Sequence, residues 1–164
     1  MNRLSKKLGD LENYPIILKK WFVNYIIGNS VKMVGTCGLK FTTLEPNRVV
    51  VNLQNKSKIQ NHIGQIHAAA STLLAETATG IIVGLSIPDD KIPLMKNLAI
   101  KFIKRSEGFQ QATASLTNDQ ILKIQTEEKG DIMVPVKVID QTGAEVILAE
   151  MNWAWIPKKK NNLK

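Results

Sequence analysis

The stretch Asn61–Ile82, NHIGQIHAAASTLLAETATGII, decides the fold of this chain of 164 residues. It is typical of one helix with a polar start and a single carboxylate, Glu76, in its middle. On a helical wheel, Ala70 and Leu74 fall on the apolar side, and Glu76 falls roughly opposite. Its many alanines allow a sheet or another helix to come close. We therefore predict a central helix that the rest of the chain surrounds.

Around this helix the sequence predicts mostly strands. Residues 39–44 and 48–53 are predicted strands separated by the turn signal Glu45-Pro46-Asn47. Strand character returns at 81–87, 95–103, 109–116, 132–139 and 145–156. Residues 118–129 are ambiguous, and we interpret them as a loop with a helical turn. Consecutive strands joined by short turns favour an antiparallel sheet, and one long helix among them favours an α+β fold.

A second helix is predicted near the N-terminus. From Pro15 to about Met33, apolar residues recur at spacings of three and four, including Trp21 and Tyr25. Such a helix packs on its own domain or lies on a membrane surface, and the pattern alone leaves both readings open.

The overall charge narrows the class of partner. The net charge is +8, with bases concentrated at both ends of the chain, which favours anionic partners. A solvated basic surface is the alternative. The lysines are not interleaved with aromatic residues and no nucleic-acid motif is present, so we expect no nucleic-acid partner.

Other patterns point to a cytoplasmic protein without stable membrane insertion. The most apolar N-terminal run, Trp21–Ile27, is far shorter than the ~20 residues that a transmembrane helix needs. The first residues are charged but lack the apolar segment of a signal peptide. The single cysteine, Cys37, cannot form an internal disulfide.

The start of the central helix has the features of an oxyanion site. Backbone N–H groups of the first turn, near His67 and Ala68, lack intrahelical acceptors and lie at the positive end of the helix dipole. Donors of this kind bind anions and developing oxyanions. Asn61 and His67 supply further side-chain donors beside them.

Glu76 is too far along the helix to join that site in the same chain. It follows Ala68 by eight residues, or about 12 Å at ~1.5 Å per residue. A base and an oxyanion hole must both lie within about 3 Å of the reacting group. If both belong to one site, Glu76 must serve a second subunit across a two-fold axis. We therefore predict a homodimer, with pairing into a dimer of dimers left open.

The residues Asn61, His67-Ala68-Ala69 and Glu76 resemble the hotdog-fold thioesterases of the phenylacetate-pathway type. That family carries an Asn, then His-Gly-Gly at the start of the central helix, then an Asp or Glu two turns later. The resemblance implies a hotdog fold, with an antiparallel sheet wrapped around one central helix. On this basis we divide the chain into an N-terminal helical extension (1–34), a hotdog domain (35–157) and a basic tail (158–164).

The same resemblance implies hydrolysis of acyl-CoA thioesters. Glu76 would be the general base or nucleophile, the Ala68 N–H would hold the oxyanion, and Asn61 and His67 would position water or the thioester. Ala68-Ala69 departs from the family's glycine pair, and each added Cβ narrows the approach of a thioester.

Three hypotheses follow. The first is an acyl-CoA thioesterase whose basic residues contact the CoA phosphates, with Lys101, Lys104 and Arg105 as candidates. The second is a non-catalytic hotdog protein that binds acyl-CoA or another lipid, which Ala68-Ala69 favours. The third is an interaction protein held at a membrane surface by residues 15–33. No metal-ligand spacing and no cofactor-binding motif is present, so we predict neither a metal nor a cofactor.

Overall fold

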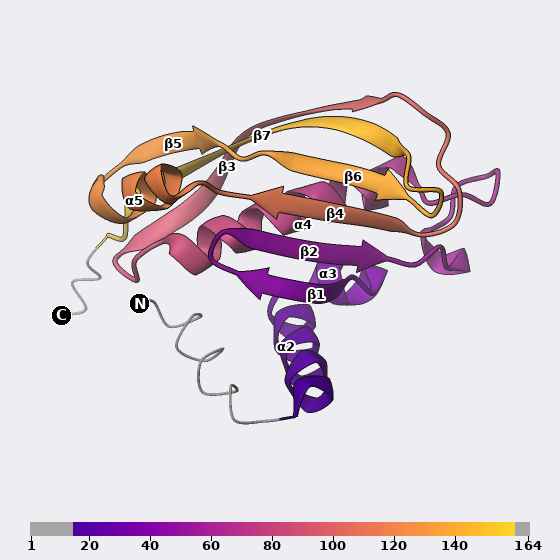
Figure 1. Ribbon diagram of the computed structural model, residues 1–164, viewed down its shortest axis with the longest axis horizontal. Coiled ribbons are helices and arrows are strands. Elements are labelled where there is room, and N and C mark those ends of the chain that lie inside the picture. Colours follow the sequence, from indigo (N-terminus) through magenta and orange to yellow (C-terminus); the bar gives the residue numbers. More distant parts are fainter. Residues whose placement is uncertain (1–14, 160–164) are drawn as a thin grey trace.

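One long helix, α4 (Ala68–Ser86), lies against an antiparallel sheet that covers it along its length (Figure 1). Its sheet-facing side chains, among them Leu74, Ala78 and Ile82, are fully buried. The computed structural model describes residues 15–159. The predicted α+β arrangement, a sheet around one central helix with an added N-terminal helix, is confirmed.

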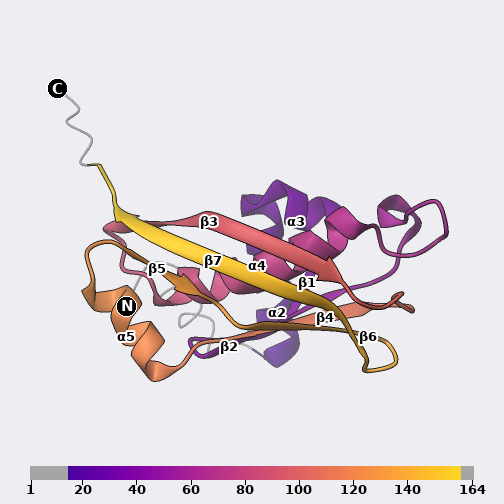
Figure 2. The same cartoon turned by 90° about the horizontal axis from the view of Figure 1, so that it is seen from above.

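The sheet has seven strands in the order β1-β2-β4-β6-β7-β3, with β5 paired to β7. Figure 2 shows this sheet from above, with β3 and β7 crossing over α4. The strands are β1 (Lys40–Glu45), β2 (Arg48–Leu53), β3 (Lys91–Phe102), β4 (Gln110–Ser115), β5 (Gly130–Met133), β6 (Val136–Asp140) and β7 (Glu145–Pro157). Besides α4, the helices are α2 (Ile16–Ser30), α3 (Lys32–Cys37), α5 (Asn118–Thr126) and the 3-10 turn η1 (Ser57–Ile59).

The central helix differs from the prediction at both ends. Residues 61–67 are not helical, because Asn61 organises a turn and Gln60 pairs with Ile66 in an isolated bridge. Residues 81–87, predicted as a strand, continue the helix to Ser86, so that prediction is wrong. Ile81, Ile82 and Val83 have strand propensity, but burial of Ile82 and Val83 under the sheet outweighs it.

The segment 118–129, interpreted as a loop, contains the regular helix α5. Thr117 and Gln120 form a capping box at its start, with Oγ1 of Thr117 accepting from the Gln120 N–H at 3.2 Å. At its other end, the buried Lys91 Nζ donates to three backbone carbonyls. The T-x-x-Q signal for this helix is present in the sequence.

Two further elements have boundaries that differ from the prediction. The strand expected at 132–139 is divided into β5 and β6, which pair with different parts of β7. Helix α2 ends at Ser30 and the short helix α3 follows, so the N-terminal helical segment continues to Cys37.

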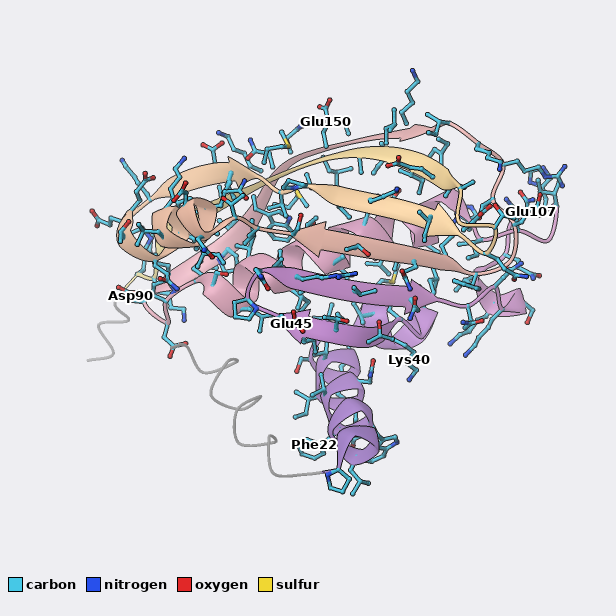
Figure 3. The ribbon with its side chains drawn as sticks, in the orientation of Figure 1. Phe22, Lys40, Glu45, Asp90, Glu107 and Glu150 are labelled. Atoms are coloured by element: carbon cyan, nitrogen blue, oxygen red, sulfur yellow. The ribbon has the colours of Figure 1, made fainter. Side chains whose placement is uncertain are left out.

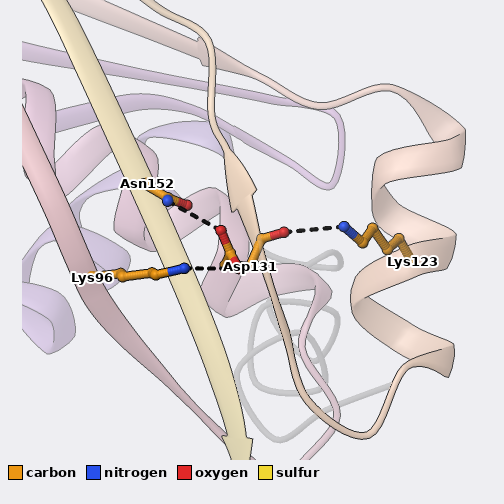
Figure 4. A network of polar contacts seen from close by, with 4 residues as sticks. All are labelled: Lys96, Lys123, Asp131 and Asn152. Atoms are coloured by element: carbon orange, nitrogen blue, oxygen red, sulfur yellow. Dashed lines mark hydrogen bonds and ion pairs between the residues drawn. The ribbon is translucent and has the colours of Figure 1, made fainter.

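A polar network fixes β5 to its neighbours (Figure 4). Asp131 forms an ion pair with Lys96 of β3 at 3.0 Å and accepts from Asn152 of β7 at 3.1 Å. These two contacts hold the pKa of Asp131 below its ordinary value. Lys123 of α5 donates to the backbone carbonyl of the same residue, so the network joins three strands and a helix.

Among the described residues, α4 is the one helix long and apolar enough to span a membrane by length and composition. The helix lies under the sheet and most of its side chains are buried. Its apolar composition is therefore that of a core helix.

A close contact between α4 and the sheet is that of Gly80 with Trp153 of β7. A Cβ at Gly80 would lie 2.7 Å from two atoms of the Trp153 ring, and the Trp153 Nε1–H donates to Thr79 Oγ1 at 2.9 Å. Gly80 therefore sets the distance between helix and sheet.

We expect Gly80→Ala to destabilise the protein. Overpacking costs about 1–3 kcal/mol, offset by at most about 1 kcal/mol of helix propensity. Urea unfolding of the variant should show a lower free energy of unfolding. The same substitution in a Trp153→Phe background should cost less, because the ring atoms that the new methyl group meets are absent. Equal costs in both backgrounds would contradict this account of the contact.

Candidate active site

The N-terminus of α4 is capped in a way that leaves one donor free. His67 is the N-cap, and its Nδ1 accepts from the Ala69 N–H at 3.1 Å. The N–H groups of Ala70 and Ser71 donate to the His67 carbonyl. Within residues 15–159, the Ala68 N–H has no hydrogen-bond partner. The helix therefore presents a single unpaired backbone donor at its positive end.

The loop before α4 is held in place by Asn61. Its Oδ1 accepts from the N–H groups of Ile63 and Gln65, at 3.1 and 3.0 Å. The His67 N–H donates to the Ile59 carbonyl at 2.8 Å, which fixes the point where the loop enters the helix. Asn61 thus fixes the conformation of the loop that leads to Ala68, and it also lines the same cleft as Ala68.

A cleft with a volume of about 130 Å³ opens at this helix end. Asn61 and Ala68 line one side, and Lys104 and Arg105, which follow β3, line another. Phe102, Val146 and Ile147 supply apolar wall. Four of the seven predicted site residues therefore meet around one cleft, although Asn61 and Ala68 lie 36 to 44 positions before Lys104 and Arg105 in the chain.

Sequence reasoning missed four polar residues of this cleft: Gln65, Ser71, Ser106 and Gln110. Gln110 is 2% exposed, donates from Nε2 to Ser106 Oγ at 2.9 Å, and has a buried Oε1 without a partner among the described residues. It occupies the same buried phase of β4 as Ala112 and Ala114. In the sequence, the signal is a glutamine at a strand position on the same face as the apolar residues Ala112 and Ala114.

The remaining predicted residues lie outside the cleft wall. His67 caps the helix and is exposed. Lys101 precedes Phe102 on β3, so its side chain is on the opposite face of the strand from the cleft. Glu76 lies more than two turns further along α4.

Glu76 is partly buried, and its surroundings are unusual for a carboxylate. Desolvation raises its pKa above 4.5, and the hydrogen bond from Thr77 Oγ1 at 3.4 Å only partly opposes this. No cation within residues 15–159 forms an ion pair with it. A desolvated carboxylate with a raised pKa is a better proton acceptor than an exposed one.

Metal chemistry has no support in the part of the chain that the structure describes. No group of three or more His, Cys, Asp or Glu side chains there is arranged to hold a metal ion. The described lining of the cleft supplies a backbone donor, side-chain amides, hydroxyls and two cations.

Residues 19–156 match the family model "Domain of unknown function (DUF4442)". The chain belongs to this family. No curated protein matches the sequence. The family description assigns no activity, so we also compared the fold with solved structures.

Solved structures with this fold include several described as thioesterases. A probable thioesterase from Pseudomonas aeruginosa is 22% identical, with a TM-score of 0.75 over 82% of this chain and 93% of its own. A thioesterase from Haemophilus influenzae is 13% identical, with a TM-score of 0.69 over 85% and 92%. A variant of a Staphylococcus aureus thioesterase is 19% identical, with a TM-score of 0.66 over 77% and 100%. The resemblance to hotdog-fold thioesterases is confirmed for the fold of this DUF4442 member.

The raised pKa of Glu76 has a consequence for stability. The folded state binds the proton of Glu76 more readily than the unfolded state, so the contribution of Glu76 to stability is most favourable below pH 4.5 and is lost as the pH rises through the folded pKa. Glu76→Gln removes the buried charge and keeps an acceptor for Thr77. We expect this variant to have a higher Tm than the wild type at pH 7 and an equal one below pH 4. A lower Tm at pH 7, at matched protein concentration, would contradict this.

Proposed function

We propose that this protein hydrolyses acyl-CoA thioesters. The observation that carries the proposal is the unpaired Ala68 N–H, which lies at the positive end of α4 beside a cleft that also holds Lys104 and Arg105. One donor at a helix N-terminus suits the oxygen of a tetrahedral intermediate, and two cations suit phosphates. The similarity in fold to thioesterases supports the same reaction class.

The site requires a base that the cleft itself lacks, and we assign this role to Glu76 of a partner subunit. Glu76 and Ala68 of one chain are about 12 Å apart along the helix axis. In a two-fold dimer with antiparallel α4 helices, the Glu76 of each chain would approach the helix start of the other. Each dimer then has two equivalent sites.

The edge strand β3 supports this dimer. It is twelve residues long, ends the sheet on one side, and exposes Leu94, Leu98 and Phe102. A long edge with apolar side chains is prone to pair with another chain. Pairing through β3 would place the partner next to the cleft, because Phe102 is part of both.

Two routes for the reaction are compatible with this geometry. Glu76 accepts a proton from water as the water attacks the thioester carbonyl, or Glu76 attacks directly and water then hydrolyses the resulting anhydride. In both routes the carbonyl oxygen gains negative charge next to the Ala68 N–H. In the first route, collapse of the tetrahedral intermediate expels the CoA thiolate, which takes the proton held by Glu76, and releases the carboxylic acid. In the second route, collapse expels the thiolate and leaves the acyl group on Glu76; water then cleaves the anhydride to the carboxylic acid and the Glu76 carboxylate, and its remaining proton goes to the thiolate.

A specific observation favours a second candidate function, binding of acyl-CoA without hydrolysis. Ala68 and Ala69 are both exposed at the helix start, so their Cβ atoms stand where a glycine pair would leave room. The Ala69 N–H is already taken by His67. Saturable binding of short, long and aromatic acyl-CoAs without turnover would establish this function in place of the first.

The oxyanion donor is testable because Ala68 is the first residue of α4. Proline is well tolerated at this position, and the extended backbone of His67 (ψ 142°) suits a following proline. Ala68→Pro should therefore fold normally and lose about 10²–10³-fold in kcat, since one oxyanion donor is removed. A kcat equal to that of the wild type on an acyl-CoA panel would refute the assignment.

Sharing of the site between subunits is tested by mixing two inactive chains. Glu76→Gln should lose at least about a hundredfold in kcat. When Ala68→Pro and Glu76→Gln chains are co-expressed, each mixed dimer has one site with both residues intact. Activity should recover to about a quarter of the wild-type level if the chains pair at random. No recovery in dimers shown by mass to be mixed would exclude a shared site.

The CoA phosphate site is tested by Lys104→Ala/Arg105→Ala. We expect KM for acyl-CoA to rise about tenfold with kcat unchanged, since charge-assisted contacts to phosphate are lost. Lys129→Ala/Lys137→Ala, at two exposed positions outside the cleft, is a control that removes the same amount of charge. N-acetylcysteamine thioesters, which lack the nucleotide phosphates, should be hydrolysed equally by all three proteins. An equal rise in KM for both classes of substrate would contradict phosphate recognition.

A further inference from the structure

Helix α2 has two faces with different surroundings. Its inner face packs on the body through the buried side chains of Val23 and Ile27. Asn24 fastens it to the edge strand β1, donating to the Phe41 carbonyl at 3.2 Å and accepting from the Phe41 N–H at 2.8 Å. The amide of Asn24 thus occupies β1 hydrogen-bonding groups that another strand would use. The helix is a fixed part of the fold.

A close crossing with α3 holds α2 at a set angle. A Cβ at Gly35 would lie 2.4 Å from the Gly28 carbonyl oxygen, so no larger residue fits at this crossing without movement of the helices. The far end of α2 projects from the body of the protein, with Phe22 near its tip (Figure 3). These contacts hold α2 in a fixed orientation, with its outer face directed away from the body of the protein.

That outer face is apolar and aromatic. Trp21 is 64% exposed and Tyr25 58%, and their rings stack with centroids 5.6 Å apart. Leu18 and Phe22, at 54% and 43%, continue the patch. Large apolar side chains gathered on one projecting element mark a surface that another body covers. We call these four residues the α2 patch.

We propose that the α2 patch docks on an anionic membrane surface. Tryptophan and tyrosine rings are favoured at the boundary between lipid headgroups and hydrocarbon. The N-terminal segment also carries a basic excess in its sequence: Arg3, Lys6, Lys7, Lys19, Lys20 and Lys32. Basic residues close in sequence to an apolar helix add attraction to acidic lipids. The patch supplies the apolar contact and the bases supply the preference for negative headgroups.

Charge argues against a second copy of this chain as the occupant. The net charge is +8, and pairing two α2 patches would bring two basic N-terminal segments together. The patch is also remote from the other unpaired edge, since α2 packs on β1 and the sheet ends at β3 on its opposite side. Docking through α2 therefore leaves β3 free for dimerisation.

The test measures binding of the full chain to lipid vesicles. We expect flotation with phosphatidylserine–phosphatidylcholine vesicles, little flotation with phosphatidylcholine alone, and weaker flotation at high salt. Trp21→Ser/Tyr25→Ser should lower the partition coefficient about tenfold or more, because two exposed rings are lost. Leu122→Ser/Met133→Ser removes two comparably exposed apolar side chains from α5 and β5 and should bind as the wild type does.

Tryptophan fluorescence gives a second readout. Trp153 and Trp155 are buried, so Trp21 is the tryptophan whose emission should move to shorter wavelength when anionic vesicles are added. In Trp21→Phe this shift should disappear while flotation persists.

Three outcomes would overturn the proposal. The first is equal flotation of wild type and Trp21→Ser/Tyr25→Ser, and the second is no preference for anionic vesicles. The third is a loss of oligomer mass in the double variant with no vesicle binding by the wild type, which would assign the α2 patch to a second copy.

Discussion

The contact of Trp153 with Gly80 determines how closely β7 lies over α4. The indole ring occupies the space where a Cβ would be, and its N–H donates to Thr79 on the same helix. Because β7 pairs with β3, β5 and β6, this contact also positions much of the sheet. Val146 and Ile147, near the start of the same strand, line the cleft at the helix N-terminus. The geometry of the cleft therefore depends on Gly80, because the absence of a side chain there lets β7 pack closely on α4.

At that helix end, the capping arrangement decides what chemistry is available. His67 uses its ring nitrogen on Ala69 and its carbonyl on Ala70 and Ser71, which satisfies the donors that follow Ala68. An N-cap side chain accepts from the second or third helical N–H, so the N–H of the first helical residue, Ala68, stays unpaired in this arrangement. The side-chain oxygen of Asn61 accepts two hydrogen bonds that hold the loop before the helix, so a substitution of Asn61 would alter this loop as well as the cleft lining.

Local patterns predicted most of the fold, because strand alternation and turn residues are encoded within a few positions. β1, β2, β4 and β7 lie where the alternation places them. The error at 81–87 arose because β-branched residues favour a strand by local propensity. The burial of Ile82 and Val83, which stabilises the helix here, is evident only in the folded chain. The cleft residues Asn61 and Ala68 were predicted together because they lie only seven positions apart in the sequence. The approach of Lys104 and Arg105 to Ala68, by contrast, depends on how β3 crosses α4, which no local pattern contains.

The position of Glu76 is hard to explain as a feature of an isolated chain. Partly buried carboxylates are usually paired, and Glu76 has a single hydroxyl contact and no cation within residues 15–159. Its desolvation costs stability at neutral pH, and within the described residues only the hydrogen bond from Thr77 opposes that cost. A carboxylate of raised pKa on a helix face of small residues is suited to accept a proton from a group that another molecule brings. The free N–H at Ala68 has the matching property, a donor without an acceptor, and two-fold pairing of α4 would bring each to the other.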